Sequence, residues 1–157
     1  MSTPTDHAAA SNAPVQSVWG GAYGTVTIGA VALIFLAAMQ SLAVTTVMPI
    51  VSDELNGAAL YAVAFSGTLA TSVIGMVAAG AWPDRSSPLK PLTAAVVLFV
   101  IGLVIAGMAA TMPTLVIGRL IQGLGVGGQT VSLYVVVARV YPAALHGRVF
   151  AAFSAAW

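Results

Sequence analysis

Cysteine is absent from this sequence of 157 residues, and charged residues are few. The absence of cysteine excludes disulfide bonds, thiolate metal sites and cysteine nucleophiles. Asp, Glu, Lys and Arg make up only 6% of the chain, against about a quarter in an ordinary soluble domain. A net charge of +1 also lacks the clustered positive charge that a nucleic-acid-binding surface requires. The composition therefore argues against a soluble domain and against a nucleic-acid partner.

Acidic residues are especially scarce, which limits the chemistry available to the chain. Asp84 is the last Asp or Glu in the sequence, and the earlier acids are Asp6, Asp53 and Glu54. Because none of them is expected at mid-membrane depth, no pair of carboxylates is available for general acid and base catalysis. His146 has no Ser or Asp arranged around it, and its neighbours are typical of a solvated loop. We therefore expect neither an enzyme nor a metal or cofactor site.

Apolar residues dominate what is present. They account for 59% of the chain, and the mean hydropathy is +1.00. Runs without charge extend over 55–83 and 91–118, and a membrane-spanning helix needs about 20 mostly apolar residues. The pattern predicts an all-α membrane protein with four transmembrane helices and an incomplete fifth. We place the membrane domain at 21–157, with helices at about 25–49, 58–81, 92–110 and 114–138 and a stub at 149–157.

The segments outside these helices differ in character. Residues 1–20 are rich in Ser, Thr, Ala and Pro, a composition that cannot bury enough apolar area to fold, so we expect a disordered tail. Arg85 and Lys90 follow the second predicted helix, and Arg139 and Arg148 follow the fourth. The loops on the other side carry no Lys or Arg. The positive-inside rule therefore predicts that the tail and the basic loops are cytoplasmic. We expect the protein in the plasma membrane.

Two kinds of polar side chain lie within the predicted helices. Arg119 stands about one turn into the fourth helix, and an isolated charge at a helix centre costs at least about 2.5 to 3.5 kcal/mol in a membrane. It could extend to the nearby interface or line a cavity; we favour the cavity, because Gln122 lies on the same helix face. Gln40, in the first helix, must satisfy two donors and an acceptor, so it should face other helices or a water-filled cavity.

Glycines in the fourth predicted helix indicate close packing. Gly123, Gly125 and Gly127 belong to a segment with the spacing Gly-x-Gly-x-x-Gly, which also occurs in dinucleotide-binding folds. That motif should follow a strand and precede an acid by about 20 residues, and neither condition holds here. A face of small residues lets another helix backbone approach, as does a similar stripe at 67–79 in the second helix. We therefore predict helix packing.

The loop between the second and third helices carries a family resemblance. Gly80, Asp84, Arg85 and the displaced Lys90 form a pattern that resembles the loop signature of the major facilitator superfamily, Gly-x-Leu-Ala-Asp-Arg-x-Gly-Arg-Arg/Lys. The first three match in place, whereas Trp82 stands where Leu is usual. The resemblance implies that these four residues act in gating, by latching the two halves of a transporter during alternating access.

Two further segments are similar to the same family. Arg119 and Gln122 belong to a stretch that resembles its fourth-helix signature, Arg-x-x-Gln-Gly-x-Gly. Residues 45–50 resemble the end of the first helix in the multidrug-exporter branch, which often has fourteen spans. That branch frequently carries Asp or Glu nine residues before the proline, whereas Gln40 occupies this position before Pro49. The resemblance implies that Arg119 and Gln122 are coupling or cavity residues; Gln40 is a coupling or cavity candidate because of its polar side chain, and no acid stands at its position to handle protons directly.

The resemblance covers about 30–157 and implies part of a secondary active transporter, a drug or small-molecule/proton antiporter. Its partners would be the lipid bilayer, a small-molecule substrate, protons and the missing remainder of the transporter. Transporters of this kind have halves built from inverted three-helix repeats, so we expect a truncated fragment that does not transport alone. The alternatives are a four-helix membrane protein with an assembly or modulatory role and, ranked last, a small four-span multidrug exporter.

Overall fold

The described part of the chain is helical throughout. The structure, a computed structural model, describes residues 23–55, 57–82, 87 and 89–157, so the predicted tail, Asp84 and Arg85 lie outside it. The first four described helices are long and apolar enough to cross a membrane, which confirms the predicted all-α class with four spans. The helices are α2 (Gly24–Glu54), α3 (Ala58–Gly80), α4 (Leu89–Gly107), α5 (Met112–Val140) and α6 (Ala143–Ala156).

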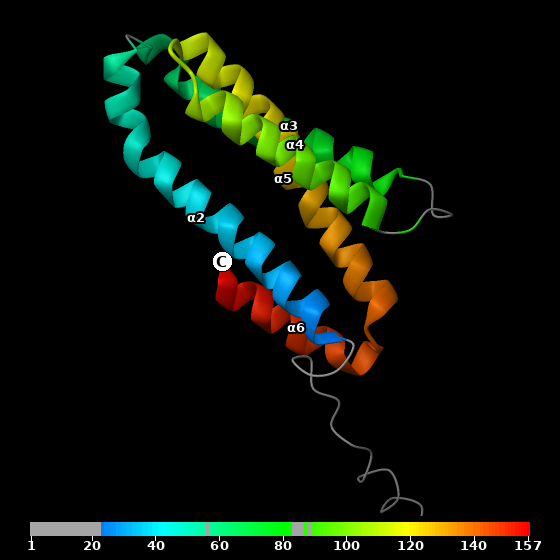
Figure 1. Cartoon of the computed structure of the whole chain (residues 1–157). Coiled ribbons are helices and arrows are strands. Elements are labelled where there is room, and N and C mark those ends of the chain that lie inside the picture. The colour runs from blue at the N-terminus through cyan, green and yellow to red at the C-terminus, as the bar shows by residue number, and fades with distance from the viewer. Residues whose placement is uncertain (1–22, 56, 83–86, 88) are drawn as a thin grey trace, which may run out of the picture.

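Helix α5 is the centre of the bundle. It packs against both α3 and α4 along its length, whereas α2 lies beside α6 and contacts α3 and α5 at few points (Figure 1). In its most apolar stretch 56% of the residues are buried, against 11–17% in α2, α3 and α4. The other helices are therefore arranged around α5.

Glycines on two faces of α5 permit this arrangement. A Cβ on Gly127 would overlap the backbone carbonyl of Ser72 in α3, and one on Gly123 would also meet the α3 backbone. A Cβ on Gly125 would lie 2.5 Å from the backbone nitrogen of Phe99 in α4. Small residues at such positions let helices approach closely where packing replaces the hydrophobic effect as the driving force. The three backbones are thus in direct contact along the centre of the bundle.

Helix α2 extends further than the sequence predicted. We expected it to end at Pro49, with Asp53 and Glu54 in a loop, but it continues through Pro49 to Glu54. A proline inside a helix removes one donor, here the partner of the Thr45 carbonyl, and is tolerated in membrane helices where other groups compensate. The Thr45 hydroxyl bonds to the carbonyl of Ser41 at 2.9 Å, as expected for a hydroxyl within an apolar helix.

The segment after α5 is also helical where a polar loop was predicted. Residues 143–148, the expected loop, and the expected stub from residue 149 form one helix, α6. Pro142 precedes it with φ −58° and ψ 147°. Proline breaks α5 but suits the start of the next helix, because the first N–H groups of a helix have no intrahelical acceptor. One apolar cluster joins α6 to α2 and α5, with Ala30, Leu133, Val137, Tyr141, Leu145, Val149 and Phe153 as its buried members.

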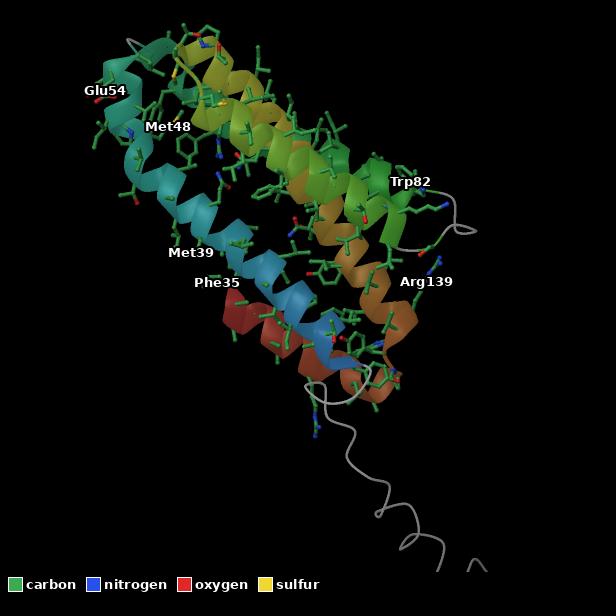
Figure 2. All side chains as sticks on the ribbon, in the orientation of Figure 1. Phe35, Met39, Met48, Glu54, Trp82 and Arg139 are labelled. Atoms are coloured by element: carbon green, nitrogen blue, oxygen red, sulfur yellow. The ribbon has the colours of Figure 1, made fainter. Side chains whose placement is uncertain are left out.

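Charged side chains mark opposite ends of the bundle. Glu54 lies at the end where α2 meets α3, and Trp82 and Arg139 lie at the other end (Figure 2). Lys90 is in the first turn of α4, and α4 begins at the end of the bundle where α3 and α5 finish (Figure 1). Lys90 and Arg139 are therefore separated from the acids of α2 by the length of the apolar spans.

The outer surface of the helices suits a lipid environment. Phe35 and Met39 project from α2 away from the other helices (Figure 2), with 52% and 51% of their surface exposed. Lipid tails are as apolar as these side chains, whereas an apolar surface of this extent is uncommon on a soluble monomer. The chain is a multi-pass membrane protein.

Candidate functional site

Three polar side chains predicted to line a cavity meet between α2 and α5. The amide nitrogen Nε2 of Gln40 donates a hydrogen bond to Oε1 of Gln122 at 3.2 Å. Nη1 of Arg119 donates to the same oxygen at 2.6 Å. Only 7% of Arg119 and 1% of Gln122 are exposed. The cluster therefore joins the loosely packed α2 to the central helix through a single shared acceptor.

Local packing explains why Gln122 is so well buried. Arg119 and Gln122 are three residues apart, so they project from the same face of α5 and can bond to each other. On α4, Gly102 lies against this turn so closely that a Cβ on it would overlap the backbone nitrogen of Gln122. Helix α4 thereby covers the turn from one side while α2 supplies Gln40 from another. The cluster is held by three helices.

The cluster has more donors than acceptors. Arg119 Nε and Gln122 Nε2 are buried and make no hydrogen bond to any described residue. The only acids in the described part of the chain are Asp53 and Glu54, in the last turn of α2. Asp53 lies about 20 Å along the helix from Gln40, at 1.5 Å per residue. Within the described residues, the Arg119 charge therefore has an amide oxygen as its partner and no carboxylate.

A cavity of about 270 Å³ adjoins the cluster between α2, α4 and α5. Gln40, Arg119 and Gln122 line its polar part, and apolar side chains such as Val44 and Leu103 line the rest. A charge at this depth is tolerated when it faces a cavity or a partner rather than lipid. Arg119 thus lines a cavity and is almost completely buried, while its role there stays a prediction.

A second cavity, of about 540 Å³, lies between α2, α5 and α6. Four aromatic side chains line it, Tyr134 of α5 and Phe150, Phe153 and Trp157 after the break, together with aliphatic residues of α2 and α5 and the buried Gln129, and we call it the aromatic cavity. The rings of Tyr134 and Phe150 are 5.5 Å apart between centroids. Sequence reasoning missed this cavity. The spacing of positions 150, 153 and 157 places them on one face of the helical stub expected from residue 149, but that spacing alone does not show that this face lies toward α2 and α5.

The residues of the loop signature are only partly described. Gly80 is the last residue of α3, and a Cβ on it would lie 4.0 Å from a methyl carbon of Val131, which is ordinary contact. The backbone N–H of Lys90 donates to the carbonyl of Ser87 at 3.1 Å. Asp84 and Arg85 lie outside the described residues. The gating role implied for these four residues stays a prediction.

The fold and the cluster define a helical membrane protein with polar groups buried among its spans, and comparison with known proteins gives the family. Residues 30–157 match the model of the Major Facilitator Superfamily. The chain belongs to this superfamily of membrane transporters.

Individual relatives agree with this assignment. The chain is 30% identical over 118 residues to myo-inositol transporter 3A of Cryptococcus neoformans. This alignment covers 73% of this chain and 20% of that protein. It is 34% identical over 109 residues to the MFS efflux transporter aclA of Aspergillus oryzae, covering 69% of this chain and 20% of that protein. An uncharacterized MFS-type transporter of Mycobacterium tuberculosis is 31% identical over 115 residues, with 73% and 17% covered. No solved structure matches the chain.

The chain spans about a fifth of the length of these curated relatives.

Proposed function

We propose that this chain forms the N-terminal part of a secondary active transporter that exports a drug or other small molecule in exchange for protons. The observation that carries the proposal is the buried cluster of Arg119, Gln122 and Gln40. A charge within apolar spans is costly, and side chains of this kind are typically retained for substrate or ion pathways. The similarity to a protein named as an efflux transporter supports export as the direction.

The cluster supports a role in coupling. Because α2 contacts α5 at few other points, a movement of α2 would break the bond from Gln40 to Gln122 and change what the Arg119 guanidinium faces. Alternating access in such transporters is largely a rocking of one helix bundle against another around a fixed site. We propose that Arg119 and Gln122 respond to proton movement and that the aromatic cavity contacts the substrate. Gly80, Asp84, Arg85 and Lys90 would then gate the basic end.

We propose further that the chain acts as part of a longer protein and does not transport by itself. In transporters of this kind the substrate lies between two repeats or halves, and the matched part of the chain covers only about a fifth of each relative. The protein detected in its natural host with an antibody against this chain should therefore migrate at several times 15.8 kDa. Detection only at 15.8 kDa would contradict this part of the proposal.

We propose that the protein lies in the plasma membrane, with its N-terminus and the basic end of the bundle on the cytoplasmic side. Because the chain has no cysteine, single cysteines report their side of the membrane without background. With Ser87→Cys, a membrane-impermeant maleimide should label inside-out vesicles and not intact cells. With Glu54→Cys, the result should be reversed. Labelling of both variants from the same side would exclude the four-span topology. Labelling of each variant from the side opposite to the expected one would show that the protein has the reverse orientation.

Transport itself is tested with the complete open reading frame that contains this chain, purified and reconstituted in proteoliposomes. An imposed proton gradient should drive uptake or release of a fluorescent substrate, and a protonophore should abolish it. The 157-residue chain reconstituted alone should give no gradient-driven flux. Gradient-driven flux with the chain alone would contradict the proposal that it needs the remainder. Flux from the complete protein that a protonophore leaves unchanged would contradict proton exchange.

A further inference from the structure

The polar cluster has fewer hydrogen-bond acceptors in use than it has buried donors. Gln40 and Arg119 both donate to one oxygen, Oε1 of Gln122. Two further donors, Arg119 Nε and Gln122 Nε2, are buried and have no partner among the described residues. Leaving a buried donor without an acceptor costs about 1 to 3 kcal/mol, and more for a charged group. Both unpaired groups are donors, and one of them belongs to the buried guanidinium itself, so the charge of the cluster favours an anionic acceptor.

We propose that the cavity between α2, α4 and α5 binds a monovalent organic anion, with a carboxylate head at Arg119 and Gln122 and a small apolar body. The inference goes beyond the proposed function, which places the transported substrate in the aromatic cavity, by naming a ligand for the cavity beside the polar cluster. A carboxylate has two oxygens that accept hydrogen bonds and matches the planar guanidinium of arginine. In this cavity the carboxylate would lie beside Arg119 and Gln122, which both line it.

The charge of the ligand follows from the charge of the site. Arg119 contributes one positive charge, and the cavity lining contains no Asp, Glu or Lys among the described residues. A monoanion would neutralise this charge, whereas a dianion such as hydrogen phosphate would leave a net charge in an apolar cavity. A cation would be repelled by the guanidinium. The site therefore selects one negative charge.

The shape of the cavity sets the body of the ligand. It holds about 270 Å³, and the side chains that extend it away from the cluster are aliphatic, among them Ala43, Val44 and Leu115. Cavities of this kind bind ligands whose apolar part fills the space while a few polar groups fix the orientation. Benzoate combines a single carboxylate with one small apolar ring, and it is the probe for this site. Benzamide has nearly the same shape without the charge.

The test measures binding by isothermal titration calorimetry, with the protein from the complete open reading frame in lipid nanodiscs. Benzoate should bind, and benzamide should bind about tenfold or more weakly, since hydrogen bonds to charged groups are worth about twice those to neutral ones. Gln40→Glu is close to isosteric and supplies an internal carboxylate beside Gln122, so it should weaken benzoate binding by about tenfold or more. Arg148→Gln removes an exposed positive charge on α6 and should leave the affinity unchanged.

The outcomes separate this inference from the proposed function. Absence of benzoate binding would overturn the inference, as would equal affinities for benzoate and benzamide or an unchanged affinity in Gln40→Glu. An equal loss in Arg148→Gln would also overturn it, because the effect would then be one of overall charge. Because binding is measured without a proton gradient, benzoate binding without transport would refute the proposed function alone. Proton-coupled transport without benzoate binding would refute this inference alone.

Discussion

Replacing Gly127 with leucine is expected to separate α5 from α3 and to unfold the bundle at physiological temperature. The backbone of Ser72 occupies the space that even a Cβ on Gly127 would need. Backbone cannot rotate away as a flexible side chain can, so the two helices must move apart. Overpacking commonly costs about 1 to 3 kcal/mol; we expect Gly127→Ala to fall in this range and Gly127→Leu to exceed it. The measurement is thermal unfolding of the purified protein in detergent, followed by circular dichroism.

The matched control is the same substitution at Gly29. This glycine is exposed within α2, and nothing lies within 4 Å of the position that its Cβ would occupy. Gly29→Leu should therefore leave the unfolding temperature unchanged or raise it, because glycine is about 1 kcal/mol less favourable than good helix formers inside a helix. If Gly127→Leu and Gly29→Leu unfold at the same temperature, the close contact between α3 and α5 does not stabilise the protein.

The number and order of the spans could be predicted because each depends on a local property, a run of apolar residues long enough to cross a bilayer. The helix ends were less predictable because proline has two opposite effects. Pro49 lies inside α2, where one lost hydrogen bond is tolerated, and Pro142 precedes α6, where no hydrogen bond is lost. Treating each proline as a helix breaker makes the predicted α2 five residues too short and predicts a loop for the first part of α6.

The members of the polar cluster could be proposed from the sequence because polar side chains in apolar helices need partners. Their shared acceptor could not be proposed, because the contact between Gln40 and Gln122 depends on how α2 crosses α5. Local spacing related Arg119 to Gln122 but placed neither near α2. The aromatic cavity was missed for a similar reason: its residues after position 149 already share a face in the predicted stub, but the packing of that face against α2 and α5 has no local signal in the sequence.

Replacing Arg119 with glutamine is expected to slow proton-coupled transport about 10- to 100-fold while leaving the protein folded. The substitution removes the bond from Nη1 to Gln122, which is made by a charged donor at 2.6 Å. Such bonds contribute about 1.5 to 3 kcal/mol, which corresponds to a loss of about 10- to 100-fold if the bond is needed during the transport cycle. Stability should be kept or increased, because a neutral amide avoids the cost of burying a charge. A residue with a purely structural role would show the opposite pattern.

Arg148→Gln is the control for this substitution, since it removes the same charge from an exposed position on α6. Its transport rate and unfolding temperature should stay close to those of the unaltered protein. Equal losses of transport in the two variants would indicate that total positive charge, and no particular position, supports transport.

The central claim is that the polar cluster of Arg119, Gln122 and Gln40 is needed for transport. The most direct test is the protonophore-sensitive flux of the Arg119→Gln protein in proteoliposomes, expressed per folded molecule. The protein is produced from the complete open reading frame, and the folded fraction is taken from its thermal unfolding. We predict a flux about 10- to 100-fold below that of the unaltered protein, with an equal or higher unfolding temperature. An unaltered flux in a fully folded Arg119→Gln protein would contradict the account.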